Sequence, residues 1–217
     1  MAFIEVQDIS KTFGTRKVLD RASMAVKRGD IVLVEGPSGI GKSTLLHIIA
    51  GIDEPNAGTV IIDDTNIFSL NEDRRAKFRL EKMGIIFQQM NLIDDLTVEE
   101  NIALPLKLAG KKWRKRVDEL VEYLKIEEVR HSLPSSISGG ELQRCAIARA
   151  LANEPEILIA DEPTSNLDNQ NTENIGKLFL KINSEMNVTL IIATHDPRIE
   201  FIGGRRFELR EGRINER

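Results

Sequence analysis

Hydrophobic and polar residues alternate near the N-terminus, and continuous apolar runs follow at wider intervals along the chain. Alternation with a period of two predicts half-buried strands at Phe3–Val6 and Ala22–Val26, with another strand expected at Thr59–Ile62. Short uninterrupted apolar runs instead predict strands that are buried on both faces. These runs lie at Ile31–Val34, Ile157–Ala160 and Thr189–Ala193.

Helical spacing of the apolar residues fills the segments between these strands. Helices are expected at Lys42–Ala50, at 72–82, over 97–130, at about 140–152 and at about 170–186. In the long middle segment, Trp113, Val117, Leu120, Val121 and Leu124 form one apolar stripe. Strands that alternate with helices favour an α/β fold with a mostly parallel sheet. The helical block at about 90–150 is expected to be an inserted subdomain.

Composition and charge narrow the class of protein. The 217 residues, 41% of them hydrophobic, suit one domain with a sizeable core. A net charge of −4 argues against a protein whose main task is to coat nucleic acid or an anionic membrane. The single cysteine, Cys145, excludes an internal disulfide and suits a small core position in a reducing compartment. Without a signal peptide or a long apolar run, a cytoplasmic location is expected.

A glycine-rich segment follows the first buried strand and opens a helix. It reads Gly36-Pro37-Ser38-Gly39-Ile40-Gly41-Lys42-Ser43, with Thr44 continuing the helix. This spacing is typical of a phosphate-binding loop, in which backbone N–H groups and a helix N-terminus surround phosphate oxygens. Lys42 would reach the outer phosphates and the Ser43 hydroxyl would ligate Mg²⁺. The alternative is a glycine-rich turn without a ligand, and the strand–helix context favours nucleotide binding.

Two further strand ends carry polar side chains. Asp161 and Glu162 end the strand at 157–160, and His195 follows the strand at 189–193. Carboxyl ends of parallel strands meet at one sheet edge, so these groups are expected near the phosphate loop. Asp161 is placed to hold Mg²⁺, Glu162 to act as a general base, and His195 to contact a terminal phosphate or the attacking water. His47 and His131 are interpreted as structural.

One motif identifies a family. Ile137-Ser138-Gly139-Gly140-Glu141-Leu142-Gln143-Arg144 resembles the signature of ATP-binding-cassette ATPases, although many members have glutamine at the position of Leu142. Gln88 resembles that family's glutamine loop, Ser165-Asn166-Leu167-Asp168 its D-loop, His195 its switch histidine, and Phe13 its adenine-stacking aromatic. These motifs stand in the family's order, so the resemblance covers essentially the whole chain. An alternative for Phe13 is a buried residue at a strand end.

The resemblance implies a fold, cofactors and a second copy of the chain. The fold would be a P-loop NTPase core with an antiparallel β portion at the N-terminus and an inserted helical subdomain. The chain would bind ATP and Mg²⁺. Ser43, Gln88 and Asp161 would ligate the metal ion, and Gln88 would also take part in catalysis. Ser138, Gly139, Gly140 and Asp168 would contact the nucleotide held by a second copy, so that a head-to-tail dimer encloses two ATP molecules and separates after hydrolysis.

The resemblance also implies a membrane partner. The stretches around Gly51–Pro55, Phe87–Leu92 and Leu96–Leu106 are similar to a subgroup of lipoprotein-releasing, macrolide-exporting and cell-division ATPases. Members pair with an integral-membrane permease, so the chain would sit peripherally on the inner face of the cell membrane. Met90 and Leu92 are candidates for docking the permease; they could equally pack between core and subdomain. The basic run Lys111–Arg116 is interpreted as the solvated start of a helix.

Three other functions are alternatives to an exporting or mechanical-stroke transporter. A regulatory ATPase of the cell-division type would signal through a permease-like partner without moving a substrate, and its catalytic residues would look the same. A DNA-maintenance ATPase would need long coiled-coil insertions, yet only about 90 residues separate Ser43 from Ser136. A translation factor would need a second cassette. Nucleic acid is therefore not expected as a partner.

Overall fold

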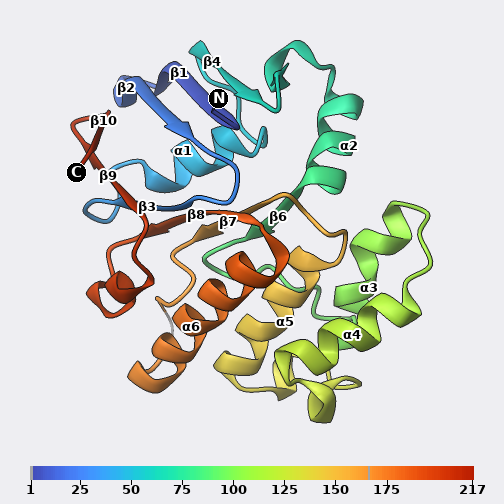
Figure 1. The fold of residues 1–217 in the computed structure, drawn as a ribbon. Coiled ribbons are helices and arrows are strands. Elements are labelled where there is room, and N and C mark those ends of the chain that lie inside the picture. Colours follow the sequence, from blue (N-terminus) through green and yellow to red (C-terminus); the bar gives the residue numbers. More distant parts are fainter. Residues whose placement is uncertain (1, 166) are drawn as a thin grey trace.

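The structure, a computed structural model, describes residues 2–165 and 167–217. Two sheets form its frame (Figure 1). The smaller sheet is antiparallel, with order β2-β1-β4-β5. Its strands are β1 (Ile4–Phe13), β2 (Arg16–Val26), β4 (Ala57–Ile62) and β5 (Thr65–Asn66).

The larger sheet has the order β10-β9-β3-β8-β7-β6 and is parallel except for β10. Its strands are β3 (Ile31–Glu35), β6 (Met83–Ile86), β7 (Ile157–Asp161), β8 (Thr189–Thr194), β9 (Arg205–Arg210) and β10 (Arg213–Glu216). Glu35 pairs with Thr194, and Asp161 pairs with Ala193. The carboxyl ends of β3, β7 and β8 therefore lie side by side at one edge, which is where a parallel sheet places its ligand crevice.

Helices cover the larger sheet on both faces (Figure 1). On one face, α1 (Lys42–Ile49) lies between the two sheets and packs in a core cluster with residues of both. On the other face lie α5 (Gly139–Leu151) and α6 (Asn169–Met186), with α3 (Val98–Leu108) and α4 (Arg114–Leu124) outside α5. The helix α2 (Glu72–Lys82) leads into β6. Short 3-10 turns occur at Ile67–Ser69, Glu127–Val129, Pro134–Ser136 and Pro197–Ile202.

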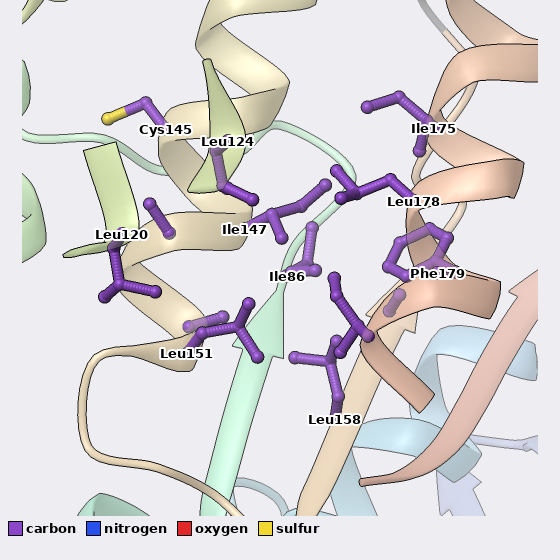
Figure 2. Close-up of a cluster of buried hydrophobic side chains, with 14 of the residues drawn as sticks. Ile86, Leu120, Leu124, Cys145, Ile147, Leu151, Leu158, Ile175, Leu178 and Phe179 are labelled. Carbon is purple, nitrogen blue, oxygen red and sulfur yellow. The ribbon is translucent and has the colours of Figure 1, made fainter. Parts of the chain in front are cut away.

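The core on the helical face joins α4, α5 and α6 to the sheet (Figure 2). Ile147 and Leu151 of α5 are fully buried together with Leu158 of β7 and Phe179 of α6. Cys145, also on α5, is fully buried beside α4, which confirms it as a small core residue. Helix α5 is thus fixed to the sheet through its C-terminal half, while Ser138 at its start is exposed.

The expected α/β fold is confirmed, with two differences in its elements. The single helix expected over 97–130 is wrong: α3 ends at Leu108 and α4 begins at Arg114. Gly110, at φ +67°, closes the end of α3, because its backbone N–H bonds to the Lys107 carbonyl and that of Lys111 to the Leu106 carbonyl. The strands β9 and β10 extend the sheet beyond the elements that the pattern indicates.

None of the helices in the described ranges combines the length and the apolar character needed to cross a membrane.

We expect Gly84→Ala to destabilise the fold. A Cβ at residue 84 would lie 2.3 Å from the backbone oxygen of Ala150, and neither β6 nor the end of α5 can shift cheaply. The free energy of unfolding in urea should fall by about 1–3 kcal/mol, the usual range for overpacking. Gly139→Ala is the control, because its backbone is helical and its Cβ would meet only Cδ2 of Leu167, at 3.9 Å. Equal losses in the two variants would contradict the packing argument.

Candidate nucleotide site

The loop between β3 and α1 has the geometry of an anion cradle. Gly41 occupies the N-cap of α1 at φ +120°, and no side chain caps the helix. The N–H groups of its first turn are therefore open to an anion. A Cβ on Gly41 would lie 2.6 Å from Cγ1 of Val18, so a glycine is needed there for steric as well as conformational reasons.

Lys42 is held inside this loop by three oxygen atoms. Its Nζ donates to the backbone carbonyls of Gly36 at 2.8 Å and Pro37 at 3.2 Å. It also forms an ion pair with Oε1 of Glu162 at 3.0 Å, and the two side chains are only 5% and 7% exposed. The two groups expected to bind phosphate and to activate water are thus paired with each other.

Glu162 joins the ends of β7 and β8. Its backbone N–H donates to the Ala193 carbonyl at 2.9 Å, and its φ of +47° turns the chain out of the strand. The ring nitrogen Nδ1 of His195 lies 2.8 Å from Oε1 of Glu162. One carboxylate oxygen therefore contacts both Lys42 and His195. The left-handed backbone of Glu162 lets its side chain take a position that a regular strand residue after Asp161 would not reach.

Asp161 is buried at the end of β7, and its Oδ1 lacks a hydrogen-bond partner among the described residues. Burial raises the pKa of the Asp161 carboxyl, and the Ser43 hydroxyl and His47 partly offset that rise. His47, on α1, also packs its ring against Phe87 with centroids 5.9 Å apart. An unpartnered carboxylate oxygen beside a serine hydroxyl is a donor set suited to a hard divalent cation. These residues fit the Mg²⁺ expected from the sequence.

A cavity of about 370 Å³ opens over the loop. Its lining includes the expected residues Phe13, Ser38, Gly39, Gly41, Lys42, Ser43, Thr44, Gln88, Glu162 and His195. Phe13 is 51% exposed at its mouth, so the alternative of a buried strand-end residue is wrong. Gly36 and Pro37 line a neighbouring cavity of about 270 Å³ that also reaches His195, and Ile40 packs against the core.

Arg16 is a lining residue that the sequence analysis missed. It pairs with Phe13 across the tight turn between β1 and β2, and its Nη2 donates to the Gly39 carbonyl at 2.8 Å. Recognition of Gly14-Thr15 as a hairpin turn would have placed Arg16 opposite Phe13.

The signature residues lie outside this cavity. Ser138 caps α5, and a capping box pairs it with Glu141, whose carboxylate accepts from the Ser138 hydroxyl at 2.6 Å. This hydrogen bond lowers the pKa of Glu141. Gly139 and Gly140 form the first turn of α5, and because Ser138 accepts from the N–H of Glu141 at 3.4 Å, the N–H groups left for an anion are those of the two glycines.

The expected D-loop is only partly within the described residues, because Asn166 lies outside them. Asp168 caps α6 by accepting from the backbone N–H of Asn171 at 2.8 Å. Arg198, which the sequence analysis also missed, ties this segment to the loop of His195. Its guanidinium donates to Asp196 at 2.7 Å, to Oδ1 of Asn169 at 2.8 Å and to the Leu167 carbonyl at 3.3 Å.

Comparison with known proteins gives a family match and relatives that cover most of the chain. Residues 19–165 match the family model described as "ABC transporter". The lipoprotein-releasing system ATP-binding protein LolD of Bacteroides thetaiotaomicron is 37% identical over 98% of this chain and 99% of its own. The methionine import ATP-binding protein MetN 1 of Bacillus cereus is 41% identical over 90% of this chain, which spans 58% of that protein's length.

Solved structures of one relative match closely. MJ0796 of Methanocaldococcus jannaschii, described as a bacterial ABC transporter cassette, has a dimeric structure with a TM-score of 0.91 and 38% identity. That match covers 99% of this chain and 97% of the other. A second dimeric structure of MJ0796, in a post-hydrolysis state with ADP and Pi bound, also has a TM-score of 0.91, at 37% identity.

We expect Asp161→Asn to stabilise the nucleotide-free protein. Because the folded-state pKa lies above the unfolded one, the protonated form of Asp161 favours folding and this contribution is lost as pH rises through the folded pKa. At neutral pH the buried carboxylate therefore costs stability, and an amide removes that cost. The melting temperature at pH 7 without nucleotide or divalent cation should rise, by roughly 2–4 °C for each kcal/mol that the buried charge costs.

Asp95→Asn is the matched control, since Asp95 is exposed. The same Asp161→Asn variant should lose the additional stabilisation that Mg²⁺ gives in the presence of ATP. An unchanged or lower melting temperature would contradict the burial argument.

Proposed function

We propose that this chain, which belongs to the ABC transporter family, drives a membrane partner as its ATP-binding and ATP-hydrolysing subunit. That it is an ATPase of this family follows from the family match and from the ADP- and Pi-bound relative. The observation that carries the proposal is a set of linked contacts in the cavity of the phosphate loop: Glu162 pairs with Lys42 and also contacts His195. Our proposal adds the roles of single residues, a second copy of the chain and a membrane partner.

In the proposed cycle, ATP phosphates replace Glu162 as the partner of Lys42. The open N–H groups of α1 and the Lys42 ammonium bind the phosphates, and Phe13 stacks on the adenine. Glu162, released from the lysine, accepts a proton from the attacking water, while His195 holds Glu162 and the terminal phosphate in position. The same carboxylate thus neutralises a buried lysine before binding and serves as base afterwards.

Mg²⁺ would be held by Asp161, Ser43 and Gln88. Within the described residues, no group of three or more histidine, cysteine or carboxylate side chains could hold a metal ion without help. The proposed cation therefore takes its other ligands from ATP phosphates and water, as Mg²⁺ commonly does. When bound, it would neutralise phosphate charge, and the unpartnered Oδ1 of Asp161 would gain its ligand contact.

A second copy of the chain would complete the site. Ser138, which caps α5, and the glycines of its first turn are exposed or half-buried at a helix N-terminus that the chain's own cavity does not use. The dimeric cassette structures of the relative MJ0796 support the same arrangement here. In this proposal Ser138, Gly139, Gly140 and the Asp168 segment close over the partner's nucleotide, and ATP joins the two copies.

The membrane partner would dock in an apolar groove of about 420 Å³ between α2, β6 and α3. Ile52 and Leu108, which are 45% and 68% exposed, lie on its border. Arg149 of α5 lines the groove and donates to the carbonyls of Met90 and Asn91 at 2.6 Å each. Through these hydrogen bonds, a partner that moves in the groove would also move the segment that carries Gln88. The chain would lie at the inner face of the membrane through this contact.

Substrate release or export is favoured over pure signalling by the lipoprotein-releasing relative. Reconstitution of the membrane partner in vesicles separates the two functions. Transport requires turnover, so substrate should move with the wild-type chain and not with a chain that binds ATP without hydrolysing it. A signalling role of the cell-division type would instead give the full response on ATP binding alone.

Glu162→Gln tests the site. Hydrolysis should fall by a factor of about 10²–10⁴, the usual contribution of a general base. ATP should bind at least as tightly as to the wild type, because phosphates no longer displace a carboxylate from Lys42. Size-exclusion chromatography with ATP should then show a stable dimer. Glu128→Gln, at an exposed residue outside both cavities, is the control and should keep wild-type turnover. A variant that holds ATP yet stays monomeric would refute the shared site, and unchanged turnover would remove Glu162 from catalysis.

Ile52→Asp tests the groove. A charge on its border should weaken association with the membrane partner at least tenfold, since burying an unpaired carboxylate is costly. ATP affinity of the isolated chain should stay unchanged. Leu133→Asp, at a residue that is similarly exposed and outside the groove, should leave association intact in a pull-down from detergent-solubilised membranes. Equal loss in both variants would show that the groove is not the contact.

A further inference from the structure

The end of α3, the connection that follows and the start of α4 carry an unusual concentration of positive charge. Six of the ten residues from 107 to 116 are lysine or arginine, and none is acidic. We call these residues the basic edge. The ATPase site uses none of them, and the expected role as the solvated start of a helix does not explain why the charge has a single sign.

Most side chains of the basic edge are exposed and have no close anionic partner. The exception is Arg116, which is 20% exposed and lies 3.4 Å from Glu119 and 3.9 Å from Glu154. Among residues 2–165 and 167–217, no carboxylate lies within ion-pair distance of Lys107, Lys111, Lys112 or Arg114, all of which are exposed. Lys115 is 93% exposed and meets only Glu119, at 3.8 Å. On the same helical block Arg130 is fully paired, with Glu99 at 2.8 Å and Asp118 at 2.7 Å. The basic edge therefore keeps its charge available.

Trp113 lies in the middle of this charge. It is half-buried against the core, with the Lys107 ammonium 5.1 Å and the Arg114 guanidinium 5.5 Å from the ring. Helix α4 begins directly after it without a capping side chain or an acidic residue in its first turn. An amphipathic ring flanked by cations is the composition that proteins place at the headgroup level of membranes.

The basic edge is continuous with the groove proposed for the membrane partner. Leu104 and Leu108 of α3 line that groove, and Lys111 follows Leu108 after a single turn. The connection between α3 and α4 projects at the outer edge of the molecule, on the side away from the C-terminus (Figure 1). A chain docked through the groove would bring these lysines to the membrane surface, so this step rests on the proposed function.

We propose that the basic edge binds the headgroups of anionic phospholipids. Flexible lysines without fixed partners suit a fluid surface of diffuse negative charge. A folded acidic protein would instead present carboxylates at fixed positions, and each lysine would have to match one of them. An extended nucleic acid would also meet the rest of a chain whose net charge is −4. A flat membrane touches only the projecting edge. The contact would orient the subunit beside its partner and become weaker as salt screens it.

Trp113 is the only tryptophan and therefore reports directly on this surface. Energy transfer from Trp113 to dansyl-labelled lipid should appear with vesicles of phosphatidylglycerol and phosphatidylcholine. It should be absent with phosphatidylcholine alone, and it should diminish with salt. Lys111→Gln together with Lys112→Gln should weaken binding roughly thirtyfold, on the basis of the usual contribution of each cation near an anionic surface.

The double variant Lys27→Gln and Lys177→Gln is the control, because it changes net charge equally at exposed positions outside the basic edge. It should retain vesicle binding. Equal losses in both double variants, or no transfer to anionic vesicles, would overturn the proposal. Binding to a DNA duplex without vesicle binding would do the same. The assay contains neither ATP nor the membrane partner, and both variants should keep wild-type ATP affinity, so its failure is distinct from failure of the ATPase function.

Discussion

The buried ion pair between Lys42 and Glu162 is the constraint on which the rest of the site depends. Two full charges, 5% and 7% exposed, meet where α1, β7 and β8 converge. Removing each charge from water costs several kcal/mol, and only close opposite charges and hydrogen bonds can offset that cost. The Gly36 and Pro37 carbonyls and His195 supply those bonds. The register of β3, β7 and β8 must therefore be correct for the pair to exist at all.

The same ion pair explains how the site would respond to phosphate. Lys42 can leave Glu162 only when another anion takes its place, because a buried lysine without a partner would be strongly unfavourable. ATP phosphates meet that requirement, and their arrival makes a carboxylate available beside His195. Binding and activation of the base would thus be one exchange of partners. Asp161 adds a buried carboxylate whose Oδ1 has no partner among the described residues, and a cation would neutralise it. The proposed phosphate and cation would therefore relieve the cost of burying these charges together.

The sequence predicted those parts of the site that follow from local spacing and from the rule on parallel strand ends. The loop at 36–43, Asp161, Glu162 and His195 all meet at one sheet edge, because each follows a buried apolar run that becomes a central strand. The pairing of Lys42 with Glu162 was not predictable, since it joins side chains from distant segments through a left-handed residue. Gly110 is a smaller example of the same limit: the helix predicted over 97–130 runs through it, yet its positive φ closes the end of α3.

Arginine side chains link the nucleotide site to both surfaces where a partner is proposed. Arg149 holds the carbonyls of Met90 and Asn91, and so connects the groove to the segment of Gln88. Arg198 holds Asp196, Asn169 and the Leu167 carbonyl, and so connects the loop of His195 to the segment that would face a second copy. Arg149 contacts backbone carbonyls alone and Arg198 contacts both backbone and side chains, and their planar guanidinium groups fix those contacts in direction. Movement of either partner would therefore displace backbone next to Gln88 or His195, which is where the proposed exchange at Lys42 takes place.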